Sequence, residues 1–74
     1  MEISEFQKLM KEKIGVEDRE MGSLFLFSVL VEEIGELAKA IRCKNEELIG
    51  EELVDVVFCV TSLANVCNQE LEPD

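Results

Sequence analysis

Apolar residues recur every three or four positions through three segments of the chain, the spacing of one face of an α-helix. The pattern predicts helices over about 3–14, from 21–23 to about 43, and from about 45 to 66–68. Gly15 is expected to end the first helix, while Ser23 and Asn45 are suited to cap the second and third. Val, Ile and Phe are frequent in 53–60, but the length and the 3.6-residue period of the segment favour helix over strand. The expected fold is all-α.

The second and third predicted helices form an antiparallel hairpin, because only a short turn near Lys44 and Asn45 joins them. Each also has a second apolar side, formed by Leu30, Ile34, Leu37 and Ile41 on one helix and by Leu53, Val57, Val60 and Ala64 on the other. A single short N-terminal helix cannot cover both. We therefore expect two hairpins to pair into a four-helix bundle, as a homodimer or a dimer-of-dimers tetramer.

Two pairs of acidic residues interrupt the apolar stripes that should form the core of this hairpin. Glu33 and Glu36 form one pair, and Glu52 and Asp55 the other; a spacing of three places both members on one helical face. The stripes read Leu26, Val29, Glu33, Glu36 or Leu37, Ala40 and Leu48, Glu52, Asp55 or Val56, Cys59, Leu63. Antiparallel packing is expected to bring the four carboxylates within reach of one another.

Unpaired carboxylates are costly to bury, and the mutual repulsion of four would exceed the stability of a small domain. Such a cluster must be protonated, hydrated or neutralised by cations. The chain has no histidine, and oxygen-only ligands suit Mg²⁺, or Mn²⁺ as a substitute, better than zinc or copper. A di-iron centre is disfavoured because such bundles normally add a Glu-x-x-His pair. A merely solvated acidic stripe is disfavoured by the apolar neighbours of all four acids.

Composition narrows the possible partners. The 74 residues allow one domain, and their net charge of −10 argues against a nucleic-acid polymer or an anionic membrane as partner. A phosphorylated small molecule stays possible, since bound metals invert the local field. No apolar run approaches the roughly 18 residues of a membrane span, and the first residues are acidic rather than basic, so a cytoplasmic location is expected. Cys59 and Cys67 are expected to be small buried hydrophobes.

The run Glu32-Glu33-Ile34-Gly35-Glu36, followed after fifteen residues by Glu52-Leu53-Val54-Asp55, resembles the MazG-like nucleotide pyrophosphohydrolases of the all-α NTP pyrophosphatase superfamily. The resemblance covers about residues 16–72. It implies a Mg²⁺-dependent enzyme that cleaves a nucleoside triphosphate between the α and β phosphates, releasing a monophosphate and pyrophosphate, in nucleotide-pool house-cleaning. The metal ligands of the family correspond to Glu33, Glu36, Glu52 and Asp55.

The resemblance also suggests further roles. Glu32 matches the first acid of the motif, with either a substrate-binding or a solvated-face role. Independently of the resemblance, one carboxylate that is not fully used in coordination, Glu36 or Glu52, could act as general base. Arg19, expected in the loop before the second helix, matches a basic position common in relatives and is a candidate phosphate contact, whereas Lys39 and Arg42 are expected on a solvated face. Phe25 and Phe27 are expected in the core rather than stacked on a base.

One departure from the family keeps a second hypothesis open. Family members usually continue past the second core helix with a basic segment that helps bind phosphates, and no Lys or Arg follows Lys44 here. Either the chain is a truncated member, or phosphate contacts come from elsewhere, including a partner subunit. The alternative function is a non-catalytic, metal-binding helical interaction module.

Overall fold

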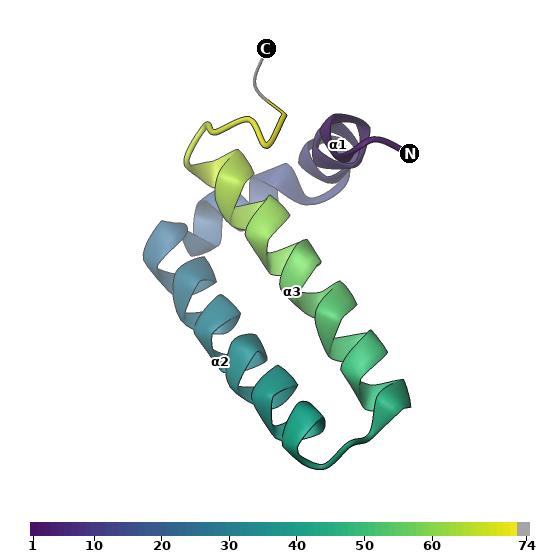
Figure 1. The fold of residues 1–74 in the computed structure, drawn as a ribbon. Coiled ribbons are helices and arrows are strands. Elements are labelled where there is room, and N and C mark those ends of the chain that lie inside the picture. Colours follow the sequence, from purple (N-terminus) through teal and green to yellow (C-terminus); the bar gives the residue numbers. More distant parts are fainter. Residues whose placement is uncertain (73–74) are drawn as a thin grey trace.

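The computed structural model describes residues 1–72, which are helical throughout apart from short turns and a C-terminal extended segment. The helices are α1 (Ile3–Met21), α2 (Ser23–Arg42) and α3 (Glu46–Val66). The long antiparallel hairpin of α2 and α3 is confirmed, and α1 crosses the end of the hairpin opposite to its turn (Figure 1). No helix of the described residues is long and apolar enough to cross a membrane.

The first helix is longer than the sequence pattern predicts, because Gly15 does not end it. A glycine inside a helix costs about 1 kcal/mol relative to alanine but keeps its backbone hydrogen bonds, so neighbouring turns can carry the helix through it. Gly15 is buried, and Nη1 of Arg19 lies 3.3 Å from the position that a Cβ would occupy. The helix ends instead at Gly22, whose φ of 84° and ψ of 160° form a backbone conformation essentially restricted to glycine.

The ends of the hairpin helices agree only in part with the predicted caps. Ser23 is the first residue of α2 rather than its cap, a position taken by Gly22 without a side-chain hydrogen bond. At α3 the prediction is confirmed, since the Oδ1 atom of Asn45 accepts a hydrogen bond from the backbone N–H of Leu48 at 3.2 Å. Asn45 therefore ends the turn and begins α3 in one step.

Small and polar residues fill much of the seam of the hairpin. Leu26 and Ala40 on α2 are buried, as are Thr61, Ser62 and Ala64 on α3. Thr61 is fully enclosed, and its hydroxyl donates to the carbonyl of Val57 at 2.8 Å, so its polar atom is satisfied.

The predicted second apolar side of the hairpin lies only partly at the surface, because Ala64 is buried and Leu30 and Leu37 are half-buried. Ile34 on α2 and Leu53 and Val57 on α3 each keep about half of their area exposed, at 49%, 49% and 48%.

The prediction that Cys59 and Cys67 are buried is wrong, because Cys59 is half-buried and Cys67 follows the end of α3, where it is exposed.

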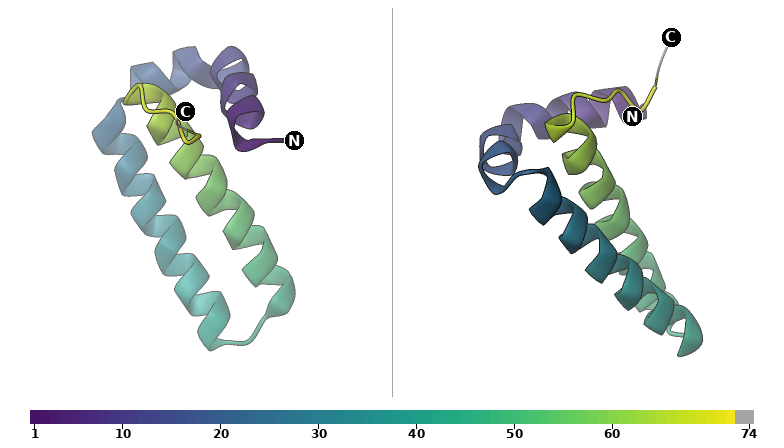
Figure 2. Two further views of the ribbon diagram at one scale, coloured as in Figure 1. Left: turned by 45° about the horizontal axis from the view of Figure 1, so that its top comes forward. Right: turned by 90° about the vertical axis from the view of Figure 1, so that its left-hand side faces the viewer.

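Polar contacts fasten the first half of α1 to the end of α3. The backbone carbonyl of buried Gln7 accepts from Nδ2 of Asn65 at 3.0 Å, and its Oε1 accepts from the backbone N–H of Leu71 at 3.1 Å. Near the N-terminus, the backbone N–H of Ser4 donates to Oε1 of Glu72 at 2.8 Å. With this half anchored, the second half of α1 lies across the open end of the hairpin (Figure 2).

Candidate metal centre

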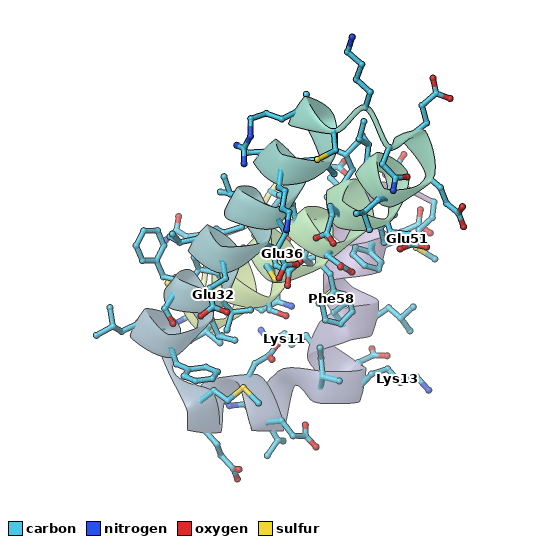
Figure 3. All side chains as sticks on the ribbon, turned by 90° about the horizontal axis from the view of Figure 1, so that it is seen from below. Lys11, Lys13, Glu32, Glu36, Glu51 and Phe58 are labelled. Atoms are coloured by element: carbon cyan, nitrogen blue, oxygen red, sulfur yellow. The ribbon has the colours of Figure 1, made fainter. Side chains whose placement is uncertain are left out.

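Three of the four predicted acids converge between α2 and α3. Glu33, Glu36 and Glu52 each place a carboxylate oxygen in a group whose members all lie within 4.8 Å of one another. Glu33 and Glu36 are one turn apart on α2, and the short turn before α3 lays Glu52 against them. Figure 3 shows Glu36 in the region where the two helices face each other.

The group combines enclosed oxygens with an accessible one. Glu52 is only 8% exposed, Glu33 is half-buried and Glu36 is exposed. The Oε2 atoms of Glu33 and Glu52 are enclosed, and within the described part of the chain no hydrogen-bond donor reaches either. An enclosed carboxylate oxygen without a donor is costly, so both atoms favour a bound cation or a proton.

The protonation of Glu52 reflects this crowding. A proton shared with Glu33, together with burial and the negative charges of Glu36, Glu33 and Asp55, raises the pKa of Glu52 to about 7. Two carboxylates can share a hydrogen bond only when one of them is protonated. The metal-free group therefore carries one negative charge fewer whenever the shared proton is bound.

Asp55 lies at the edge of this group rather than inside it. Its side chain is exposed, and it is not among the three acids whose oxygens approach within 4.8 Å. The helical period allowed either Asp55 or Val56 on the inner face of α3 at this turn. In the structure Val56 is half-buried and Asp55 is exposed, so Val56 is the inner residue. The charge of Asp55 still contributes to raising the pKa of Glu52, so the two carboxylates are neighbours.

In a comparison with protein families, residues 21–74 match the MazG nucleotide pyrophosphohydrolase domain. The chain belongs to the MazG family. The match includes all four acids and leaves out most of α1. Neither the comparison with curated proteins nor the comparison with solved structures gives a match.

The remaining predicted contacts of this MazG domain are dispersed over its surface. Glu32 is exposed on α2 (Figure 3). Arg19 is also exposed, but it lies on the last turn of α1 rather than in a loop, with its guanidinium beside Gly15. Lys39 and Arg42 are exposed on the last turns of α2, as expected.

A cavity of about 440 Å³ opens where α1 crosses the hairpin, next to the acidic group. Its apolar lining consists of Ile14, Met21, Phe25, Leu26, Val29 and Phe58. Phe25 and Phe27 are about half exposed, so their predicted place in the core is wrong. Burial, and then the charges of Glu33, Asp55 and Asp18, raise the pKa of the cavity-lining Cys59 thiol, which connects the cavity electrostatically with the acids.

Asp18 is the residue that the sequence reasoning missed. With Gly15 expected to end the first helix, Asp18 fell outside the predicted helices, yet it lies in α1, is 6% exposed and lines the cavity. Its Oδ2 atom is enclosed and has no hydrogen-bond partner in the part of the chain that the structure describes. The helical phase of Met10, Ile14 and Asp18, at intervals of four residues, is the signal that could have placed it on the inner face of α1.

Proposed function

We propose that this MazG domain is a divalent-metal-dependent nucleoside triphosphate pyrophosphohydrolase that converts a (d)NTP into the (d)NMP and pyrophosphate. The observation that carries the proposal is the group formed by Glu33, Glu36 and Glu52, with two enclosed oxygens that lack donors. Membership of the MazG nucleotide pyrophosphohydrolase family supports it. House-cleaning of the nucleotide pool, in the cytoplasm, is the role we assign to this reaction.

The residues fit Mg²⁺, with Mn²⁺ as a substitute. Hard divalent ions take carboxylate oxygens, and the group offers three within 4.8 Å without any nitrogen or sulfur donor. Glu33 and Glu52 would bind the ion from opposite helices, and the exposed Glu36 would be the third carboxylate ligand. Asp55 would add a further ligand or a negative charge at the edge of the group. When bound, the ion neutralises charge on the phosphate oxygens and lowers the pKa of a water molecule.

The chain itself supplies a proton acceptor near that water. Glu36 and Glu52 are the two candidates for general base, and each is a carboxylate at the seam of the hairpin. Glu36 is exposed and can reach a water at the open side of the group, whereas Glu52 is enclosed and is better placed to bind the ion. We therefore favour Glu36 as the base and Glu52 as a ligand.

The phosphates need positive partners besides the metal. Arg19, on α1, is the candidate within this chain, and Glu32, exposed on α2, is a further candidate for a substrate contact. A partner subunit is the other source of such contacts.

The test is pyrophosphate release from a panel of nucleoside triphosphates with Mg²⁺, Mn²⁺ or EDTA. Turnover that requires the metal and yields the monophosphate is the expected result. Glu33→Gln, Glu36→Gln, Glu52→Gln and Asp55→Asn are each expected to lower kcat at least a hundredfold, because each removes a ligand charge or the base. Glu51→Gln is the matched control, since Glu51 is an exposed acid on α3 outside the group (Figure 3). Wild-type rates in any of the four variants would remove that residue from the site.

The same preparation distinguishes the enzyme from a non-catalytic metal-binding module. Calorimetry with Mg²⁺ or Mn²⁺ measures binding without turnover. Metal binding that depends on Glu52, combined with no pyrophosphate from any nucleotide, would favour the interaction module over the enzyme.

We further propose that two hairpins pair into a four-helix bundle, as a dimer or a dimer of dimers. Ile34, Leu53, Val54 and Val57 leave an exposed apolar surface along the hairpin, and such a surface favours a partner. Light scattering on the eluting protein measures the mass in solution. Val57→Glu is expected to yield the monomer while retaining helicity, and a wild-type chain that elutes as a monomer would refute the pairing.

A further inference from the structure

The cavity between α1 and the hairpin contains one feature that metal binding does not explain. Asp18 is 94% buried (6% exposed), lines the cavity and has an enclosed Oδ2 atom that finds no hydrogen-bond partner among residues 1–72. Buried carboxylates normally accept two or more hydrogen bonds, and an unsatisfied one destabilises the fold. No lysine or arginine is among the residues that line the cavity. A donor that enters the cavity would therefore satisfy an oxygen that no donor among residues 1–72 reaches.

The rest of the lining restricts what that donor can be attached to. Phe25, Phe58 and Val29 present flat or apolar surface, and the lining also includes Ser62, which is 3% exposed, and the exposed Glu17. A fully hydrated cation or a sugar would lose hydrogen bonds on entering such a lining. A planar heterocycle would lose few hydrogen bonds in this cavity, because its faces are apolar and only its edge is polar. The volume of about 440 Å³ lies in the usual range for small-molecule sites.

The cavity lies next to the acidic group, where it could receive the base of a nucleotide whose phosphates bind at the acids. Val29 precedes Glu33 by one turn of α2, and Cys59 follows Asp55 by one turn of α3, so two helices run directly from the acids into the cavity wall. A molecule whose phosphates bind at the acids would extend its other end into this space. This step rests on the proposed function, because it takes the acids as the phosphate end.

The geometry points to Asp18 as the residue that selects the base, accepting a hydrogen bond from an exocyclic amino group, so that nucleotides of cytosine, adenine or guanine are preferred over those of uracil or thymine. A carboxylate can only accept, and each of the three preferred bases offers an N–H₂ group at its pairing edge. Uracil and thymine flank their single N–H with two carbonyl oxygens, which a carboxylate repels. Asp18 is a specificity residue in this scheme and takes no part in the chemical step.

The test compares base preference in the wild-type chain and in Asp18→Asn. The kcat/KM values for dCTP, dATP and dGTP are compared with those for dUTP and dTTP, with Mg²⁺. In the wild type, the kcat/KM for at least one amino-bearing nucleotide should exceed the values for dUTP and dTTP by about ten- to hundredfold. This factor corresponds to one hydrogen bond to a charged group. Asp18→Asn should reduce that ratio to near one, mainly through KM. Glu20→Gln, which removes an exposed acid from the same helix, should leave the ratio unchanged.

A second readout needs no turnover. Calorimetry with dCMP, dAMP, dGMP and dUMP measures the same preference in the binding of monophosphates. A preference that depends on Asp18 would support the inference even if no pyrophosphate is released, which would refute only the proposed function. Turnover with the same base ranking in wild type and Asp18→Asn would refute the inference and leave the proposed function intact.

Folding is controlled separately. Circular dichroism of Asp18→Asn and Asp18→Ser should show intact helices, with a Tm equal to or above that of the wild type, because a buried charge without a partner has been removed. If neither variant folds, the wild-type ranking decides: a preference for dUTP or dTTP overturns the inference, and a preference for an amino-bearing base supports it.

Discussion

Binding of Mg²⁺ should be coupled to the release of one proton from Glu52. The pKa of this carboxyl is raised from 4.5 to about 7, first by the proton shared with Glu33 and then by burial and neighbouring charge. In the metal-free protein Glu52 is therefore about half protonated at pH 7, about nine-tenths protonated at pH 6 and about one-tenth protonated at pH 8. The metal binds the ionised form, so it must displace this proton.

The magnitude follows directly from these occupancies. Lowering the pH from 8 to 6 should weaken the apparent affinity for Mg²⁺ about tenfold, because the ionised fraction of Glu52 falls from about nine-tenths to about one-tenth. Calorimetric titrations in two buffers of different ionisation enthalpy count the protons released. The count should be about 0.9 at pH 6 and about 0.1 at pH 8.

Two variants control this experiment. Glu52→Gln cannot release the proton and should bind Mg²⁺ weakly, with little dependence on pH between 6 and 8. Glu51→Gln removes one exposed negative charge from the neighbouring position and should keep the wild-type proton count. A wild-type affinity that is constant from pH 6 to 8, without proton release, would refute the argument that Glu52 and Glu33 share a proton.

The same pKa shift determines how the stability of the metal-free protein varies with pH. The folded state holds the Glu52 proton more tightly than the unfolded state does, since the pKa rises from 4.5 to about 7 on folding. The resulting stabilisation is fully present below pH 4.5 and is lost as the pH rises through 7. In EDTA, the Tm should therefore fall between pH 5 and 7.5 by more in the wild type than in Glu52→Gln. An equal fall in both would show that other groups cause it.

Substitutions at the element ends give predictions that depend only on local structure. Gly22→Ala should destabilise the fold by about 1–3 kcal/mol, because alanine is strained at a φ of 84° even though no atom lies within 4 Å of the added Cβ. Gly50 lies inside α3, where an added Cβ also meets no atom within 4 Å, so Gly50→Ala should instead stabilise the fold by about 0.5–1 kcal/mol. Urea unfolding measures both, and a stabilising Gly22→Ala would contradict the strain argument. Asn45→Ala removes the hydrogen bond to the N–H of Leu48 and should cost about 1 kcal/mol in the same assay, whereas an unchanged midpoint would show that the cap contributes nothing. Gln7→Ala should speed amide exchange at Leu71, whose N–H it now binds, and equal exchange in both proteins would show that the segment is held by other contacts.

Much of the fold was determined by local sequence. Three helical periods, a short turn and the Asn45 cap are sufficient to define the hairpin, because each depends on residues close in sequence. The convergence of Glu33, Glu36 and Glu52 follows from the same features, since the spacing of three fixes a shared face and the short turn fixes the register. The grouping of Ile34 with the other apolar residues of its side, and of Leu53 with Val57, was also predictable, since a shared face needs only the helical period.

Tertiary packing decided the rest. A period of 3.6 does not distinguish Asp55 from Val56, and only the rotation of α3 against α2 placed Val56 inward and Asp55 at the edge of the acids. Gly15 looked like a helix end because its intrinsic preference opposes helix, and contacts made by α1 as a whole overrode that preference. Asp18 became a buried carboxylate only when α1 packed across the open end of the hairpin. Helical spacing is a property of neighbouring residues, whereas burial depends on which distant element covers them.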